Sequence, residues 1–452
     1  MSLLRANHQV LPPIISHGRG STLYDIYGKD YIDGSSGAMV ANLGHGIEEI
    51  AEAAASQMRT VAYTYRTQFR NEPAETLAAS LTRLSDDKKS AFFLSSGSEA
   101  TEAAIRLAIQ FWQEAGLGTK RRILSRRISY HGNTLGALSI SADSRRQAVS
   151  GLAVETTLVP ACYPYRCTAA GDCDGSCICH LEDTIELVGA ANIAAFVLEP
   201  VIGASGGAIV PHGSYLRQVR EICDRNNILL IFDEVITGLG RTGKWFAAHH
   251  WNVSSDITIL GKGLNAGFTP LSALLLSERV TKAIEQGSGR ITFGHTHSGN
   301  PASTAICNAV INYIERNDLV ARAESLGPHL YERLLEAARQ HQFVGDIRGI
   351  GMLWGIEFVS DPETKRPFDR LFGITDKVVT SAAANGLIVY PCRGLHGAHD
   401  INAVLIAPPL TIEPSELDAL FDRLSKTLHD VAKQLPSYSN AKEEPAHEVA
   451  LV

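Results

Sequence analysis

The sequence predicts an α/β fold built on a mainly parallel sheet, and two patterns support this prediction. Short apolar runs alternate with longer helical stretches up to about residue 320, which is the order expected of βαβ units. Several runs are apolar at every position, as in strands that are covered on both faces. The strands are expected at residues 91–94, 122–125, 194–198, 228–232, 257–260 and 272–276.

Helices are expected between these strands, and the pattern then changes to that of a smaller α+β unit. The expected helices are 99–114, 215–226, 301–315, 321–340 and one from Pro414 onward. The expected later strands are 345–348, 352–359, 387–390 and 403–407. Residues 25–33 alternate in polarity around Gly28, which predicts a hairpin.

These patterns suggest a division into two domains. Residues 1–60 are expected to form the N-terminal part of a small domain, 61–325 a large domain, and 326–435 the rest of the small domain. Residues 436–452 are rich in Glu, Ala and Ser and are expected to form a polar tail.

The composition is that of an ordinary globular protein. The chain has 452 residues, 45% hydrophobic and 20% charged, with a formal net charge of −7. It has no basic block, so neither nucleic acid nor a membrane surface is expected as a partner. No apolar run approaches the roughly 18 residues of a membrane span, and the N-terminal residues are too polar for a secretory signal. The expected location is the cytoplasm.

The loop after the first predicted strand, residues 95–100, has the features of a phosphate cradle. Gly97 allows the backbone to approach an anion closely. Ser98 suits the N-cap of the following helix, and Ser96 with Glu99 has the spacing of a capping box. A helix N-terminus of this kind can bind a phosphate, although a well-capped helix without any ligand would have the same sequence.

Two further loops carry an acid and a lysine. Asp233 follows the apolar run 228–232, where a buried carboxylate needs a cationic partner. Lys262 stands between two glycines after another apolar run, and a buried lysine becomes a nucleophilic amine. Taken singly, Asp233 could belong to a core ion pair or a helix cap, and Lys262 to a solvated turn. Together with the cradle, they follow the order needed to hold one cofactor by phosphate, ring nitrogen and aldehyde.

The sequence resembles the class III (ω-type) aminotransferases, which depend on pyridoxal phosphate (PLP). The resemblance rests on residues 233–235 (Asp-Glu-Val), 237–243 (Thr-Gly-Leu-Gly-Arg-Thr-Gly) and 261–263 (Gly-Lys-Gly), and it spans about residues 25–409. It implies PLP as the cofactor and PLP fold type I, with a large mainly parallel-sheet domain and a small α+β domain.

The resemblance also implies a role for each matching residue. Lys262 is expected to bind the cofactor aldehyde as a Schiff base, and Asp233 to pair with the ring nitrogen. The other expected contacts are Gly97 and Ser98 at the phosphate, Tyr130 and Val235 on the two faces of the ring, Glu199 near Asp233, and Thr296. Thr296 is expected to reach the phosphate in the neighbouring subunit, which implies a homodimer with its active sites at the subunit interface.

The implied reaction moves an amino group from a primary amine or ω-amino acid to a small 2-oxo acid such as pyruvate. Its order is ping-pong, with Lys262 as general base and acid. A PLP-dependent lyase, racemase or mutase on the same fold is the alternative, because the named residues do not decide which substrate bond reacts. A zinc-binding regulatory module without PLP is a third hypothesis, but it leaves Asp233 and Lys262 without a function.

Substrate recognition departs from the family pattern. In this family, relatives that act on γ-aminobutyrate or ornithine share a glutamate after Glu-Pro and an arginine in the small domain. Residues 204–205 (Ala-Ser) and Tyr390 stand at those places here. Arg393 is a candidate carboxylate ligand or a solvated loop residue, and Tyr63 and Phe69 are candidate pocket walls or plain packing.

Five of the eight cysteines lie between Cys162 and Cys179, directly before His180. Thiolates and an imidazole could bind zinc, but the segment contains no Cys-x-x-Cys pair. We therefore expect reduced cysteines in a surface loop and no metal.

Overall fold

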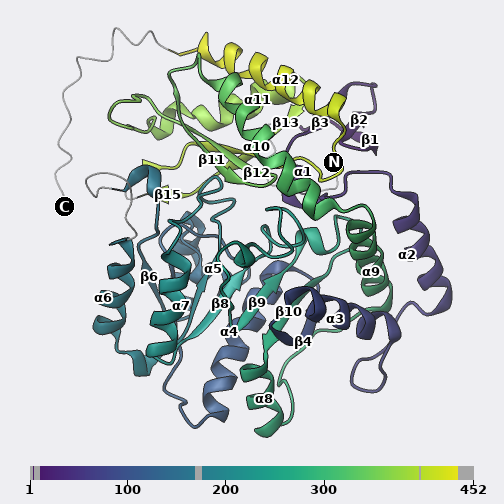
Figure 1. The fold of residues 1–452 in the computed structure, drawn as a ribbon, viewed down its shortest axis with the longest axis vertical. Coiled ribbons are helices and arrows are strands. Elements are labelled where there is room, and N and C mark those ends of the chain that lie inside the picture. The colour runs from purple at the N-terminus through teal and green to yellow at the C-terminus, as the bar shows by residue number, and fades with distance from the viewer. Residues whose placement is uncertain (1–3, 5–10, 168–175, 397–398, 436–452) are drawn as a thin grey trace.

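The computed structural model describes residues 4, 11–167, 176–396 and 399–435, and Figure 1 shows their arrangement. The expected tail 436–452 and Cys173 lie outside these residues. The helices are α1 (Ser36–Met39), α2 (Glu48–Thr60), α3 (Glu72–Ser85), α4 (Gly97–Glu114), α5 (Leu135–Ile140), α6 (Cys179–Val188), α7 (Tyr215–Arg225), α8 (Glu278–Gln286), α9 (Pro301–Arg316), α10 (Leu319–Ala338), α11 (Ile374–Ala384) and α12 (Pro414–Ala432). None of the described helices is long and apolar enough to cross a membrane.

A seven-stranded sheet forms the centre of the lower part in Figure 1, in the order β4-β10-β9-β8-β7-β5-β6. Its strands are β4 (Lys88–Leu94), β5 (Arg122–Arg126), β6 (Thr156–Val159), β7 (Ile193–Leu198), β8 (Leu229–Asp233), β9 (Ile257–Leu260) and β10 (Ser272–Ser277). Only β10 runs antiparallel to its neighbours, so the expected mainly parallel sheet is confirmed. The sequence missed β6 because this edge strand is only partly buried and begins with two threonines.

Alternating side chains of the central strands enter two separate cores. Phe196 of β7 packs in the core that contains Leu216 of α7, whereas its neighbours Ala195 and Val197 pack in the core that contains Ile105 of α4. Successive side chains of a strand point to opposite faces, so helices must cover both faces of the sheet. This double cover explains why β7 and β8 are buried along their whole length.

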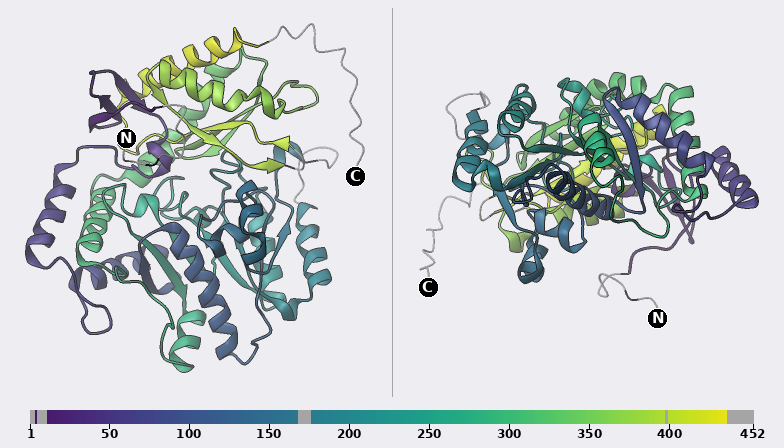
Figure 2. Two further views of the ribbon diagram at one scale, coloured as in Figure 1. Left: turned by 180° about the vertical axis from the view of Figure 1, so that it is seen from behind. Right: turned by 90° about the horizontal axis from the view of Figure 1, so that it is seen from below.

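Two smaller sheets form the upper part of the molecule, seen from behind in Figure 2. One has the order β11-β12-β17-β14, with β11 (Val344–Ile350), β12 (Leu353–Phe358), β14 (Tyr390–Cys392) and β17 (Ala403–Ile406). The other has the order β1-β2-β3-β13, with β1 (Ile15–Arg19), β2 (Thr22–Asp25), β3 (Asp30–Asp33) and β13 (Leu387–Ile388). The small remaining pair is β15 (Leu395–His396) with β16 (His399–Asp400).

The hairpin expected at residues 25–33 is present as β2 and β3, and β3 pairs in parallel with β13 near the other end of the chain. The prediction of one continuous strand at residues 387–390 is wrong. It divides at Val389 into β13 and β14, which belong to different sheets. The N-terminal hairpin thus lies in the part formed by the C-terminal third, while the proposed domain boundaries stay a prediction.

Candidate active site

The turn between β4 and α4 leaves the N-terminal end of α4 able to bind an anion. Ser96 is the N-cap of α4, and its Oγ accepts a 3.2 Å hydrogen bond from the N–H of Glu99. The expectation that Ser98 is the cap is therefore wrong, because its Oγ accepts from the N–H of Asn133 at 2.9 Å instead. The Glu99 carboxylate accepts from the N–H of Ser95. The first N–H groups of this 18-residue helix lack intrahelical partners, so its end can bind a phosphate.

Val235 brings three loops of the sheet edge together. A Cβ atom added to Gly97 would lie 3.3 Å from Val235 Cγ1, and so would a Cβ atom added to Gly261. The two glycines therefore allow the loops after β4 and β9 to approach the loop after β8 closely. Because Gly261 directly precedes Lys262, the start of α4 and the lysine both lie close to Val235, and a Cβ atom added to Gly261 would lie 3.8 Å from Gly97 Cα.

Asp233 ends β8 as a buried carboxylate with two partners. Its Oδ2 lies 2.7 Å from Nδ1 of His131, and its Oδ1 accepts from the N–H of Val235 at 3.1 Å. A ring N–H that donates to a carboxylate fixes the orientation of both groups. No role was predicted for His131 from the sequence alone.

Glu199 follows the neighbouring strand β7 and is also buried. Burial, together with the nearby charge of Asp233, raises the pKa of Glu199 to about 8. Its Oε2 has no hydrogen-bond partner among the residues that the structure describes. Two adjacent buried carboxyl groups are costly unless a cation joins them. The protonated ring nitrogen of PLP would supply a positive charge beside these two carboxyl groups.

Lys262 lies at the start of a short 3-10 helix after β9, and its backbone has a left-handed φ of 40°. This conformation is unfavourable for a residue with a side chain and is often found at functional sites. Burial lowers the pKa of Lys262 to about 8, although Asp233 and Glu199 act in the opposite direction. At pH 7 roughly a tenth of the amine is therefore uncharged, which is far more than for an ordinary exposed lysine.

Tyr130 lies in the loop after β5, next to the turn that precedes α4. A Cβ atom added to Gly132 would lie 2.5 Å from Ser98 Oγ, so this loop rests directly on the start of α4. The Tyr130 side chain is partly buried, and the guanidinium of Arg145 covers its ring at 5.4 Å from the centroid. Sequence reasoning did not single out Arg145.

The remaining expected residues are more exposed. Thr296 is exposed, and the adjacent His297 makes an edge contact with Tyr63, with ring centroids 5.9 Å apart. Phe69 is 63% exposed and lies in the same N-terminal segment as Tyr63. Arg393 forms a 2.9 Å ion pair with Asp376 at the surface. The substrate roles of Tyr63, Phe69 and Arg393 stay predictions.

Two buried arginines support the site and were not anticipated. Arg126 ends β5, and its guanidinium donates to the backbone carbonyl of Glu199. Arg241, in the motif 237–243, donates to the carbonyls of Met352 and Pro408 and to Asn42 Oδ1. A charged residue at the end of a buried strand was the signal that identified Asp233, and the same signal would have identified Arg126.

The cysteine segment is only partly a surface loop. Cys162 is buried in the core, whereas Cys179 is exposed at the start of α6. The ligand atoms of Cys179, His180 and Asp183 lie within 4.8 Å of one another, and all three residues are exposed. The absence of a metal stays a prediction.

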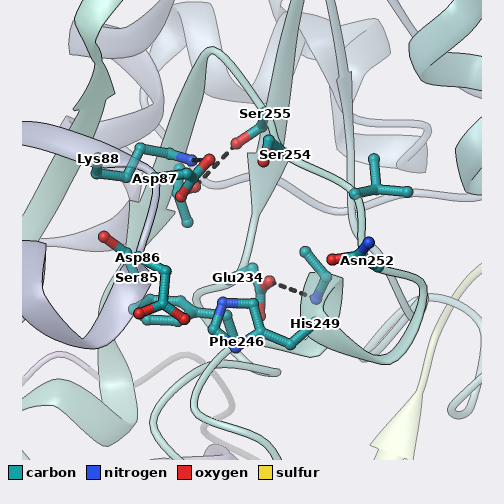
Figure 3. A pocket seen from close by; sticks show the side chains of 13 residues that line it. Ser85, Asp86, Asp87, Lys88, Glu234, Phe246, His249, Asn252, Ser254 and Ser255 are labelled. Atoms are coloured by element: carbon teal, nitrogen blue, oxygen red, sulfur yellow. Dashed lines mark hydrogen bonds and ion pairs between the residues drawn. The ribbon is translucent and has the colours of Figure 1, made fainter.

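A polar cavity of about 380 Å³ lies beside Glu234, the residue that follows Asp233 (Figure 3). Glu234 lines it, with Lys88 and His249 among its other walls. The Glu234 carboxylate accepts from the N–H groups of Ala247 and Ala248 at 2.6 and 2.9 Å, so it has contacts separate from those of Asp233. None of the residues expected to hold PLP lines this cavity.

Comparisons with known proteins agree with this geometry. The family model for class-III aminotransferases matches residues 4–428. The uncharacterized aminotransferase YodT of Bacillus subtilis is 42% identical over 94% of this chain and 96% of its own length. A leucine/methionine racemase of Thermococcus litoralis is 36% identical over 94% of this chain and 93% of its own length.

Solved structures extend the likeness to the fold. An amine transaminase from an uncultivated Pseudomonas species, solved with bound PLP, has a TM-score of 0.89 and 33% identity. The match covers 95% of this chain and 98% of that one. A transaminase from the marine bacterium Virgibacillus has a TM-score of 0.87 and 32% identity, with 95% of each chain covered. The chain therefore belongs to the class III aminotransferase family, and it is a PLP-dependent transaminase of PLP fold type I.

Proposed function

We propose that this enzyme moves an amino group from a primary amine or ω-amino acid to a small 2-oxo acid such as pyruvate. The observation that carries the proposal is the buried group formed by Asp233, Glu199 and Lys262, in which two carboxyl groups face an amine with a lowered pKa. Similarity to a solved amine transaminase supports an amine as the donor.

The chain's own residues hold the cofactor in this proposal. When bound, PLP supplies a ring that stores the electron pair released from the substrate. Asp233, oriented by His131, keeps a proton on the ring nitrogen. Val235 and Tyr130 pack against the two faces of the ring. The start of α4, with Gly97 and Ser98, binds the phosphate, and Thr296 of a second subunit adds a further contact there.

Lys262 performs the proton transfers. Its Nζ is the group that would hold the cofactor aldehyde in the resting enzyme. As a free amine, the same Nζ would take a proton from the donor carbon that bears nitrogen and would later give it up again. A pKa of about 8 suits both directions of this transfer near neutral pH.

The visible absorbance spectrum of the purified protein, compared with Lys262→Ala, tests the cofactor and the lysine together. We expect a yellow band in the wild type that is altered in Lys262→Ala and unchanged in the control Lys244→Ala, because Lys244 instead pairs with Glu324. A wild-type protein that stays colourless with added PLP would contradict the assignment of Lys262.

The same band separates transamination from other PLP reactions. We expect a panel of primary amines to bleach it and pyruvate to restore it, because each half-reaction changes the cofactor. Consumption of an amino acid without any 2-oxo acid would instead indicate a lyase or a racemase.

A further inference from the structure

Arg145 covers the expected cofactor-stacking tyrosine and is held there by one carboxylate. Its guanidinium lies 5.4 Å from the centre of the Tyr130 ring. Its Nε and Nη2 donate to the two carboxylate oxygens of Asp143 at 2.8 and 2.7 Å. Asp143 also caps the helix η1 (Ser144–Leu152), accepting from the N–H of Arg145 at 2.9 Å. Asp143 thus occupies the fork of an arginine that stands over Tyr130.

The small domain contributes Tyr390 to the same place. Burial raises the pKa of Tyr390, and Tyr130 and Arg145 are among the ionisable groups close enough to influence it. Some relatives share an arginine at the position of Tyr390, and this arginine binds a substrate carboxylate. The chain therefore lacks an arginine at that position, but two arginines, Arg145 and Arg393, lie close enough to influence Tyr390.

We propose that Arg145 binds the carboxylate of the 2-oxo acid acceptor, with Asp143 holding the guanidinium whenever the bound substrate is uncharged. This inference rests on the proposed aminotransferase function. A planar guanidinium binds a carboxylate through two parallel hydrogen bonds, and Asp143 already shows this geometry. A substrate carboxylate would replace Asp143 in that fork, whereas an uncharged amine would leave the internal pair closed.

Arg393 is the competing carboxylate ligand, and its surroundings favour it less. The side chains of Arg393 and Asp376 are 70% and 66% exposed, whereas those of Arg145 and Asp143 are 52% and 11% exposed. Exposed ion pairs are weakened by water and salt, so the more shielded pair gives a stronger preference for a charged substrate.

Titration of the holoenzyme with propionate, which has the carboxylate of pyruvate but no reactive carbonyl, measures this site directly. We expect Arg145→Gln to weaken propionate binding roughly 10- to 100-fold, because hydrogen bonds between charged groups are lost. Arg145→Lys is expected to be intermediate, since an ammonium cannot form the two parallel bonds. The neighbouring Arg146→Gln is the control and should bind propionate like the wild type.

Kinetics with a matched pair of acceptors give a second readout. We expect Arg145→Gln to lower kcat/KM for pyruvate by about the same factor, while kcat/KM for propanal, which lacks the carboxylate, stays within about twofold. Asp143→Asn should shift propionate affinity the other way, because it frees the guanidinium yet keeps a capping side chain.

Two results would overturn the proposal. One is propionate binding by Arg145→Gln that equals the wild type, and the other is a loss of binding in Arg393→Gln alone. If the wild-type enzyme transferred no amine to any 2-oxo acid, the proposed function would fail, but the propionate titration would still decide the role of Arg145.

Discussion

Glu199 is a side chain whose protonation state is set by its surroundings. It is buried beside Asp233, and these surroundings raise its pKa to about 8. The positive charges of Arg126 and Lys262 act in the opposite direction but do not compensate for burial. The carboxyl is thus held largely neutral near pH 7 in the cofactor-free protein.

This pKa makes a prediction for the stability of the cofactor-free protein. The carboxyl has a higher pKa in the folded than in the unfolded chain, so the folded state binds more protons between about pH 4.5 and pH 8. Its contribution to the free energy of unfolding therefore falls as pH rises through that range, by up to about 1.4 kcal/mol per pH unit, and is constant above it. Glu199→Gln removes this dependence.

Thermal unfolding of the cofactor-free proteins at pH 5, 6.5 and 8 measures the effect. The midpoint of Glu199→Gln should exceed that of the wild type by an amount that grows with pH. The exposed Glu332→Gln serves as the control and should follow the wild type. A constant difference between Glu199→Gln and the wild type would show that Glu199 titrates normally.

At the scale of elements, the sequence predicted the helices and strands that local residue patterns determine. The strands β8 and β9 are buried throughout because helices cover both faces, so the charged residues Asp233 and Lys262 at or after their ends were conspicuous. The edge strand β6 and the division of residues 387–390 between two sheets depend on distant partners, which no local pattern contains. The pairing of His131 with Asp233 was missed for the same reason, since 102 positions separate them.

The close packing of the loops after β4 and β8 yields a prediction about Gly97. In Gly97→Ala the new Cβ would lie 3.3 Å from Val235 Cγ1, so the Val235 side chain must shift by a few tenths of an ångström. We expect PLP affinity, measured by fluorescence titration, to fall roughly tenfold, equivalent to about 1.4 kcal/mol. The double variant Gly97→Ala/Val235→Ala should recover part of it.

Gly213→Ala provides the matched control for this substitution. Its added Cβ would meet no atom within 4 Å, so PLP affinity should not change. If Gly97→Ala bound PLP like the wild type, Val235 would not touch the cofactor, and its expected packing against the ring would be wrong.

At the scale of the whole molecule, one buried guanidinium joins distant parts of the chain. Arg241 follows β8 yet donates to Asn42, Met352 and Pro408, so the motif 237–243 links the large sheet to both ends of the chain. The sequence showed this motif but could not show its partners, because they lie 111 to 199 positions away.

A second whole-molecule feature is the apolar surface formed by residues in and just after α2, the helix that Figure 1 shows at the edge of the molecule. Met58, Tyr63, Tyr65 and Phe69 are 58%, 42%, 47% and 63% exposed. Clustered exposed apolar side chains mark interaction surfaces. Since Tyr63 contacts His297, the neighbour of Thr296, this surface is continuous with the residue proposed to enter a second subunit.

The proposed dimer can be tested by mixing two inactive subunits. If each active site combines Lys262 of one subunit with Thr296 of the other, a heterodimer of Lys262→Ala and Thr296→Glu has one doubly altered site and one intact site. Random pairing on co-expression should therefore restore about one quarter of the wild-type number of intact sites. The transaminase activity and the visible absorbance band should both recover in that proportion.

The control pairs Lys262→Ala with Asp233→Ala. Both residues belong to the same subunit's site, so every site in that heterodimer carries one defect and no activity should return. If Lys262→Ala with Thr296→Glu also stayed inactive while forming heterodimers, Thr296 would serve its own subunit or neither. Recovery only in the Thr296 pair would place each active site across the subunit interface, because no other arrangement produces an intact site from two altered chains.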